Sequence, residues 1–404
     1  MEKNILPIKK AVFIFFVFAC GYFISALLRA ITATLSPLLT LEFNLTAGNL
    51  GLLAGGYFLG FACMQIPLGY LLDRHGPKKI VSSFLLIAII GTSAFALAQS
   101  FSGLLISRIL IGVGVSACLM GPLTGYRIWF ADEYQQRANA WMLMVLSMGF
   151  VFSTLPVQIL LPIIGWRWIF GLVVILILIV ILLTLLFIPK WKTENNNQEK
   201  NAGSLSDVWK NNFFRSTIPL GLFNYGGIVA VQTLWAGPWM VRVAGYTPLE
   251  SATGLFWINA TMLFAFFVFG YILPKITKLG IESIKLIKLG LPISYLSLLV
   301  IIILGENAGA LHFTIYILTS IFLTLTQPAV ALSFPTSLAG KSLTSFNLLI
   351  FVGTFIMQWG IGLIIDFCKF LGKEEVQSFK ISFTVYLIIC IFSYLYFLMN
   401  NKNA

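Results

Sequence analysis

The sequence alternates long apolar runs with short polar breaks along nearly its whole length. Each run approaches or exceeds the roughly 20 residues that a helix needs to cross the hydrocarbon core of a bilayer. The pattern therefore predicts an all-α integral membrane protein with twelve transmembrane helices. The predicted spans are 11–39, 50–72, 80–98, 102–126, 140–163, 168–188, 216–239, 251–274, 284–304, 309–337, 344–366 and 380–399.

The longest polar interval follows the sixth predicted span and divides the spans into two sets of six. We predict an N-terminal six-helix bundle over residues 1–189, a cytoplasmic linker over 190–215 and a C-terminal six-helix bundle over 216–404. A degenerate repeat supports pseudo-symmetric halves, because the segments Gly69–Lys79 and Gly270–Gly280 follow the second span of each half.

Composition agrees with a lipid environment, since 59% of the 404 residues are hydrophobic and only 10% are charged. A water-soluble globule of this length needs more polar surface. When residues at span ends are counted with the adjoining side, 19 of the 26 lysines and arginines lie on the side of the N-terminus and 5 on the opposite side, while Arg29 and Arg108 lie deep within spans. This bias predicts both termini in the cytoplasm. The net charge of +12 is not gathered into one basic face, so nucleic-acid binding is not indicated.

Two features of the sequence resemble other kinds of protein. Lys9 and Lys10 precede an apolar stretch that ends at Cys20, as in a lipoprotein signal peptide. The apolar run continues past Cys20, so we expect a retained first span. The five cysteines lack metal-ligand spacing, and no cofactor, metal site or catalytic group is predicted.

Two motifs lie at the second and fourth predicted spans. The first has a glycine, then Asp-Arg-x-Gly and further basic residues, at Gly69, Asp73, Arg74, Gly76, Lys78 and Lys79. The second, Arg-x-x-x-Gly-x-Gly, is formed by Arg108, Gly112 and Gly114. With these motifs the chain resembles the major facilitator superfamily. The resemblance implies the two-bundle fold. It also implies transport of a small solute by a rocker-switch mechanism, in which the binding site opens alternately to each side of the membrane. A glycine- and proline-rich pattern found in many drug–proton antiporters is not met at 147–162, which weighs against multidrug efflux.

The first motif also has a physical interpretation as a gate. A helix that ends at Leu72 presents free carbonyls and a partial negative charge, which favour the basic residues Arg74, Lys78 and Lys79. Asp73 can pair with a base or with a helix N-terminus, closing one conformation and releasing the other. The alternative is a basic cluster that only sets the topology.

Polar residues on the inner helices indicate where a substrate binds. Tyr22, Ser25 and Arg29 share one face of the first span, and Arg108 lies at a similar predicted depth in the fourth. An arginine is costly against lipid, so Arg29 is expected to point inward, and both arginines are predicted to bind an anion. For each, a structural arginine bonded to backbone carbonyls is the alternative. Neutral partners are predicted in the second half at Asn224, Gln232, Trp235 and Gln327.

Energy coupling has few candidates, because every acidic residue falls at a span end or in a loop. Asp366 and His312 are predicted as proton-coupling residues, with a merely structural role as the alternative. Symport, uniport and exchange all stay open.

The predicted function is secondary active or facilitated transport of a small organic solute. The arginines favour an anionic or zwitterionic solute, such as an amino acid or a carboxylate-like nutrient, in a monomeric multi-pass protein of the cell inner membrane. Export of a siderophore or drug-like compound is an alternative, as is a non-transporting sensor on a carrier fold. An intramembrane enzyme is not indicated, because two histidines and no buried carboxylate pair leave no catalytic group.

Overall fold

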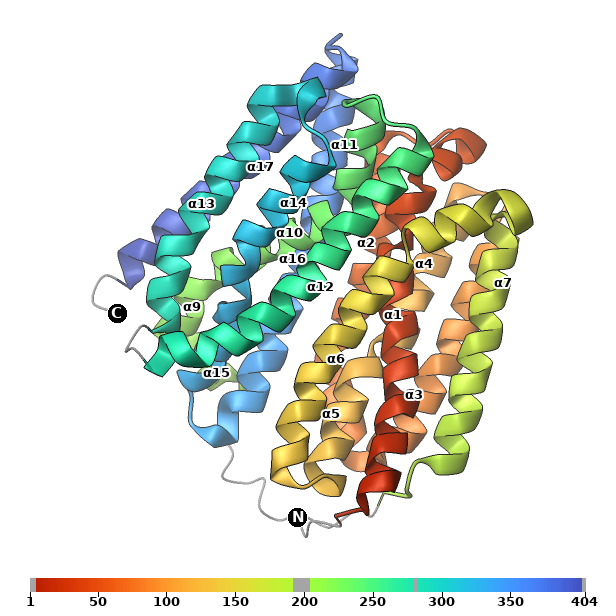
Figure 1. Cartoon of the computed structure of the whole chain (residues 1–404), viewed down its shortest axis with the longest axis vertical. Helices are drawn as coiled ribbons and strands as arrows, with labels where there is room; N and C mark the ends of the chain where they lie inside the picture. Colours follow the sequence, from red (N-terminus) through yellow and green to blue (C-terminus); the bar gives the residue numbers. More distant parts are fainter. Residues whose placement is uncertain (1–4, 192–203, 279–281, 402–404) are drawn as a thin grey trace. The chain divides into compact units, whose positions relative to one another are not determined.

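The computed structural model describes residues 5–191, 204–278 and 282–401, and every regular element within these ranges is a helix (Figure 1). Helices suit lipid because each satisfies its own backbone N–H and C=O groups. The predicted all-α membrane fold is confirmed. Residues 192–203 of the predicted linker lie outside the described residues, and so do residues 279–281, the first two of which end the second repeat segment.

Contacts group the chain into two compact units. Unit 1 consists of Met1–Ile31 and Gly56–Asn197, and unit 2 of Thr32–Gly55 and Gln198–Ala404. The predicted bundles, divided at residues 190–215, remain a prediction. The contacts differ from that division at Thr32–Gly55, which groups with the second half of the sequence.

Unit 1 holds five whole helices and parts of two more. The whole helices are α3 (Gln65–Leu97), α4 (Phe101–Val115), α5 (Ala117–Trp129), α6 (Asp132–Phe152) and α7 (Leu155–Phe187). The helices α1 (Ile8–Phe43) and α2 (Ala47–Cys63) each belong partly to unit 1 and partly to unit 2. Within unit 1, α3 packs along α4 and α7.

Two glycines bend long helices of unit 1. The backbone leaves the helical region at Gly76 in α3 (φ 75°, ψ 162°) and at Gly165 in α7 (φ 74°, ψ 158°). Positive φ is unfavourable for residues with a Cβ, so glycine suits both positions. Each bend separates two apolar segments that the sequence predicts as separate spans.

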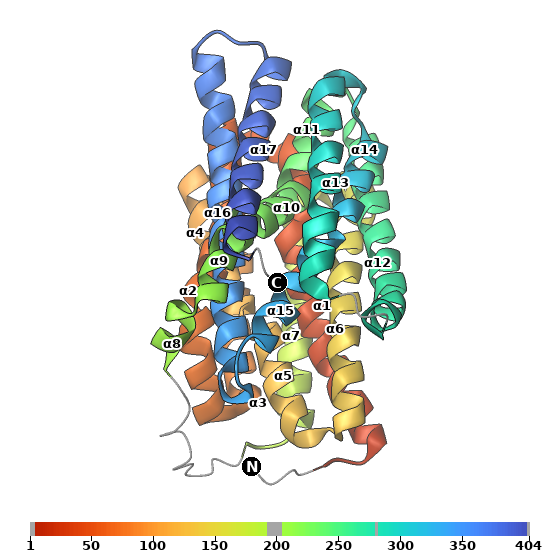
Figure 2. The ribbon, with the colours of Figure 1, turned by 90° about the vertical axis from the view of Figure 1, so that its left-hand side faces the viewer.

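Unit 2 holds the remaining elements. They are α8 (Leu205–Lys210), α9 (Asn212–Pro219), η2 (Leu220–Tyr225), α10 (Gly226–Ala230), η3 (Val231–Trp235), α11 (Ala236–Arg242), α12 (Pro248–Lys278), α13 (Ser283–Leu304), η4 (Gly305–Asn307), α14 (Ala310–Thr319), η5 (Ser320–Leu325), α15 (Thr326–Leu332), α16 (Thr336–Phe370) and α17 (Glu375–Asn400). In Figure 2, α16 and α17 run side by side, joined by a hydrogen bond from Ser382 Oγ to the Ile361 carbonyl at 2.9 Å.

Several predicted spans are not continuous α-helices. The seventh contains two π-helical segments, η2 and η3, and the tenth contains the 3₁₀ segment η5. The fourth is interrupted at Ser116 and the fifth at Ser153 and Thr154. At each interruption a hydroxyl donates to the carbonyl three residues earlier, as from Ser116 to Val113 at 2.7 Å. Such bonds compete with the helical ladder and bend it.

Nine helical stretches among the described residues are long and apolar enough to cross a membrane, against twelve predicted spans. They are Ile8–Phe43, Gln65–Leu97, Phe101–Trp129, Leu155–Phe187, Pro248–Leu273, Ser283–Asn307, Ala310–Leu332, Leu338–Phe370 and Glu375–Asn400. The other three predicted spans correspond to the short apolar helices Ala47–Cys63 and Arg137–Phe152 and to the seventh span, which is divided into short helical segments. The chain is a multi-pass membrane protein, and twelve crossings remain the predicted number.

Candidate functional site

Arg29 lies inside unit 1, on α1, with only 7% of its surface exposed. Its guanidinium carbon is 5.3 Å from the ring centre of Phe61 and 5.8 Å from that of Tyr57, both on α2. The negative face of an aromatic ring attracts a cation at such distances. Arg29 of the first span thus lies in the protein interior, as the sequence predicts.

Hydroxyl groups lie beside this arginine. Tyr57 donates to the Ser25 carbonyl at 3.0 Å, and its oxygen lies 3.0 Å from Ser25 Oγ. Tyr22 is on the same helix and is 3% exposed. Tyr57 is missing from the predicted residues because it stands in a glycine-rich apolar run with no polar periodicity. Together, Arg29, Ser25 and Tyr57 offer one cation and two hydroxyls, a set suited to an oxyanion.

Arg108 has different surroundings. It is 1% exposed and donates from Nη1 to the Leu28 carbonyl at 2.7 Å, which links α4 to α1. Its guanidinium carbon lies 5.4 Å from the ring centre of Phe95 on α3. Its Nε is buried without a hydrogen-bond partner among the described residues. These are the contacts of an arginine that joins three helices, which favours the structural alternative.

The glycines after Arg108 allow the helices around it to touch. A Cβ on Gly112 would lie 2.0 Å from the Tyr57 carbonyl oxygen, and one on Gly114 would lie 2.2 Å from the Ala88 amide nitrogen. Neither distance is possible for a residue with a side chain. The second motif therefore serves close packing of α4 against α2 and α3.

Unit 2 contributes neutral polar groups that bond to one another. Gln232 donates to Asn259 at 3.0 Å, and the buried Gln358 donates to Thr233 at 3.0 Å. Trp235 is fully buried and donates from Nε1 to the Gln358 carbonyl at 3.1 Å. The Oε1 atom of Gln358 is buried without a partner among the described residues. Gln232 and Trp235 therefore adjoin a network of amides between η3, α12 and α16.

The other two predicted neutral groups are also hydrogen-bonded within unit 2. Asn224 donates to the Cys390 carbonyl and to Ser393 Oγ on α17, and accepts from the Tyr295 hydroxyl at 2.7 Å. Gln327 donates to Asn347 at 2.5 Å. A solute that bound Asn224 would have to displace one of its three protein partners, so we leave Asn224 out of the site proposed below.

The predicted gate residues surround the bend of α3. Asp73 and Arg74 are exposed, Lys78 is half-buried, and a Cβ on Gly69 would meet nothing within 4 Å. Gly76, the remaining predicted gate residue, is buried. Arg74 donates to the Tyr70 hydroxyl at 3.1 Å.

An unpredicted residue, Trp191, docks on this bend. It donates from Nε1 to the Asp73 carbonyl at 3.2 Å, and a Cβ on Gly76 would lie 2.2 Å from its side chain. Gly76 is therefore required by its neighbour as well as by its positive φ. The contact could not be found from sequence, because 118 residues separate Trp191 from Asp73.

The two predicted proton-coupling residues both accept from backbone amides at helix starts. His312 Nδ1 accepts from the Gly309 amide at 3.2 Å, at the start of its own helix, α14. Asp366 on α16 accepts from the amides of Ala47 and Gly48, at 2.9 and 2.7 Å, at the start of α2. Both therefore have a structural role in this conformation.

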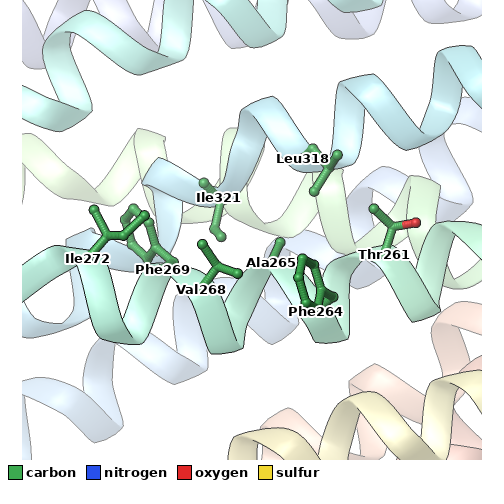
Figure 3. A pocket seen from close by; sticks show the side chains of 8 residues that line it. All are labelled: Thr261, Phe264, Ala265, Val268, Phe269, Ile272, Leu318 and Ile321. Carbon is green, nitrogen blue, oxygen red and sulfur yellow. The ribbon is translucent and has the colours of Figure 1, made fainter.

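Unit 2 also has a shallow groove of about 320 Å³ between α12 and the α14–η5 segment (Figure 3). Its only polar side chain is Thr261. The lining residues are Thr261, Phe264, Ala265, Val268, Phe269, Ile272, Leu318 and Ile321. Because it holds no charge, the groove is not suited to bind an anion by itself, and it contains no predicted site residue.

Comparison with known proteins decides the family. The sequence profile of the Major Facilitator Superfamily matches residues 18–358, most of the chain. The chain belongs to this superfamily. The match includes both motifs, Arg29 and most of unit 2, so the resemblance predicted from sequence is confirmed.

Relatives and solved structures of this superfamily differ in what they carry. The chain is 26% identical over 166 residues to a probable sulfoacetate transporter of Cupriavidus necator, a match that covers 41% of this chain and 38% of the relative. A bacterial homologue of the human lysosomal transporter Spinster, solved inward-facing and occupied, aligns with a TM-score of 0.80 at 16% identity, over 99% and 98% of the chains. A D-xylose–proton symporter aligns with a TM-score of 0.78 at 13% identity, over 96% and 97%. These structures establish the fold alone.

Proposed function

We propose that the protein carries a small organic solute with an anionic or zwitterionic group, and that Arg29 binds this group. The observation that carries the proposal is a guanidinium only 7% exposed, inside a membrane-spanning helix, beside two aromatic rings. Ionisable residues at such positions are costly and usually line a substrate or ion path. A planar guanidinium binds two oxygens of a carboxylate or sulfonate at once.

The solute class follows from charge. The relative named for sulfoacetate supports an organic acid, whereas the neighbour named for D-xylose is a carrier of a neutral sugar. A guanidinium forms two charge-assisted hydrogen bonds with a carboxylate or sulfonate, which a neutral sugar cannot form. Arg29 therefore favours the acid. Of the neutral candidates, Gln232 and Gln327 stay in the proposed site as half-buried amides.

The proposed mechanism is alternating access, in which one central site opens to each side of the membrane in turn. We place both termini in the cytoplasm of a bacterial-type inner membrane, because 19 of the 26 basic residues lie on that side by the predicted spans. Asp73 and the basic residues near Gly76 then lie at the cytoplasmic gate. Facilitated transport or exchange needs no further group, and proton symport is the alternative.

The test is transport by the purified protein in liposomes, with labelled organic acids, sulfonates, amino acids and neutral sugars. Uptake and efflux are both measured, with and without a pH gradient. We expect an organic acid or zwitterion to be carried. Arg29→Gln should raise its KM about 10- to 100-fold, because a charge-assisted hydrogen bond is lost.

The matched control is Arg242→Gln, which removes an arginine that contacts Glu375 at 3.4 Å and is not among the predicted site residues. This variant should leave KM unchanged. If the Arg29→Gln protein transported the acid with wild-type KM, or if only neutral sugars were carried, the proposed role of Arg29 would be wrong. A pH gradient that drives accumulation would assign proton coupling.

A further inference from the structure

The division between the two units passes through the middle of two helices. The first parts of α1 and the last parts of α2 belong to unit 1, but Thr32–Gly55, which joins them, belongs to unit 2. Because α1 and α2 are each continuous across this division, Thr32–Gly55 is held both by its covalent continuity with the rest of these helices and by its contacts in unit 2. A rearrangement of α1 and α2 therefore has to break the contacts of this segment in unit 2.

One carboxylate joins this segment to α16. The two oxygens of Asp366 accept from the Ala47 and Gly48 amides at 2.9 and 2.7 Å, although the residues are 319 and 318 positions apart. The first amides of a helix have no partner within it and carry a partial positive charge, so an anion there is favourable. A Cβ on Gly48 would lie 2.7 Å from Asp366 Oδ2, so the absence of a side chain admits the carboxylate.

The start of α2 does not depend on Asp366 alone. Thr46 Oγ1 accepts from the Asn49 amide at 3.2 Å, which is a local cap of the ordinary kind. Release of Asp366 would expose two amides to water without removing this cap. The helix can therefore leave the carboxylate and stay folded.

Glycines also line this interface. A Cβ on Gly51 would lie 2.2 Å from the Gln358 carbonyl oxygen, and one on Gly55 would lie 2.9 Å from the Phe355 ring. On the opposite helix, a Cβ on Gly362 would lie 2.3 Å from the Ala47 carbonyl oxygen. Such surfaces carry no directional bonds of their own, whereas the Asp366 bonds fix the start of α2 against α16.

We infer that Asp366 is a latch of the transport cycle, which holds Thr32–Gly55 in unit 2 while one side of the membrane is closed. When the Asp366 bonds break, the segment joins the rest of α1 and α2 and that side opens. The inference rests on the alternating access proposed above. By the predicted topology the latch lies at the outer end of the eleventh span, opposite in depth to Asp73 at the inner end of the second.

The test is the distance between nitroxide labels on Leu41 and Phe370, measured by double electron–electron resonance in the full-length protein in nanodiscs. Both positions suit a label, since they are 80% and 85% exposed, and both lie in unit 2. Cys20 and Cys63, the exposed cysteines, are replaced by serine. We expect Asp366→Asn to increase the ratio of long to short distances about 3- to 30-fold, the range expected for a lost N-cap contact.

Glu375→Gln is the matched control, because Glu375 is at the same end of unit 2 but contacts Arg242 and Lys369 instead. It should leave the distances unchanged. Gly48→Ala is the second variant, which pushes the carboxylate away without removing it and should shift the ratio in the same direction as Asp366→Asn. Unchanged distances in Asp366→Asn and Gly48→Ala, or an equal shift in Glu375→Gln, would overturn the latch.

The label distances do not depend on which solute is carried. A shift in Asp366→Asn combined with transport of neutral sugars alone would overturn the anion site and keep the latch. Anion transport that depends on Arg29, combined with unchanged label distances in Asp366→Asn, would overturn the latch and keep the anion site.

Discussion

The polar interiors of the two units differ in charge. Among the described residues, Arg29 and Arg108 are the only charged residues that are buried, and both belong to unit 1. The buried polar groups of unit 2 are hydroxyls and amides such as Asn224, Asn259 and Gln358, which bond largely to one another and to backbone carbonyls. A neutral group can be satisfied within the protein, whereas a charge needs an opposite charge or a strong dipole. The proposed anion site therefore lies in the unit that contains the buried arginines.

The largest effect on stability is expected for Arg108→Ala. Truncation empties a fully buried volume and removes the charge-assisted bond to the Leu28 carbonyl, so we expect a loss of about 3 kcal/mol in the free energy of unfolding. Urea or thermal unfolding in detergent measures it. The surviving folded protein should keep its KM. A stable variant with a greatly raised KM would place Arg108 at the substrate instead.

A smaller loss is expected for Asn224→Leu in unit 2. The substitution leaves the Tyr295 hydroxyl and the Cys390 carbonyl without this partner, at a cost of about 1 to 2 kcal/mol, near the upper limit for hydrogen bonds between membrane helices. The same unfolding assay applies, with Ser294→Ala as control, because the buried Ser294 Oγ donates within its own helix to the Leu291 carbonyl at 2.8 Å. If Asn224→Leu lowered the free energy of unfolding as much as Arg108→Ala does, the buried charge of unit 1 would not matter more to stability than the buried neutral groups of unit 2.

The smallest stability effect is expected for Gln232→Leu. Gln232 is half-buried and donates only to Asn259 in the contacts described, so the loss should be about 0.6 kcal/mol. The effect of Gln232→Leu on KM tests whether a neutral group of unit 2 also binds the solute. If Gln232 binds the neutral part of the solute, KM rises by several-fold while stability barely changes, and an unchanged KM would remove it from the site.

The apolar pattern predicts the membrane helices well, because lipid imposes one simple requirement on every span. Interior placement of Arg29 is equally predictable, since no stable position for it exists against lipid. Bends at Gly76 and Gly165 agree with breaks in the predicted spans. The docking of Trp191 and the partners of Asp366 are not predictable, because residues more than a hundred positions apart meet only in the folded chain.

The seventh span shows a second limit. Regular α-helical periodicity places Asn224, Gln232 and Trp235 within one arc, but their contacts lie on different helices: α13 and α17, α12, and α16. The π segment η2 contains Asn224, and η3 contains Gln232 and Trp235, so the helical register changes at these residues. Periodicity assigns faces correctly only while the number of residues per turn stays constant.

The same wide turns have a mechanical consequence. A π turn contains about one residue more than an α turn, so when such a turn migrates along a helix, the residues it passes rotate by about 100°. Gly226–Ala230 is a single short α segment enclosed by two wide turns. Migration of either turn past this segment would therefore rotate Gly226 against the Gly353 backbone of α16, on which it packs.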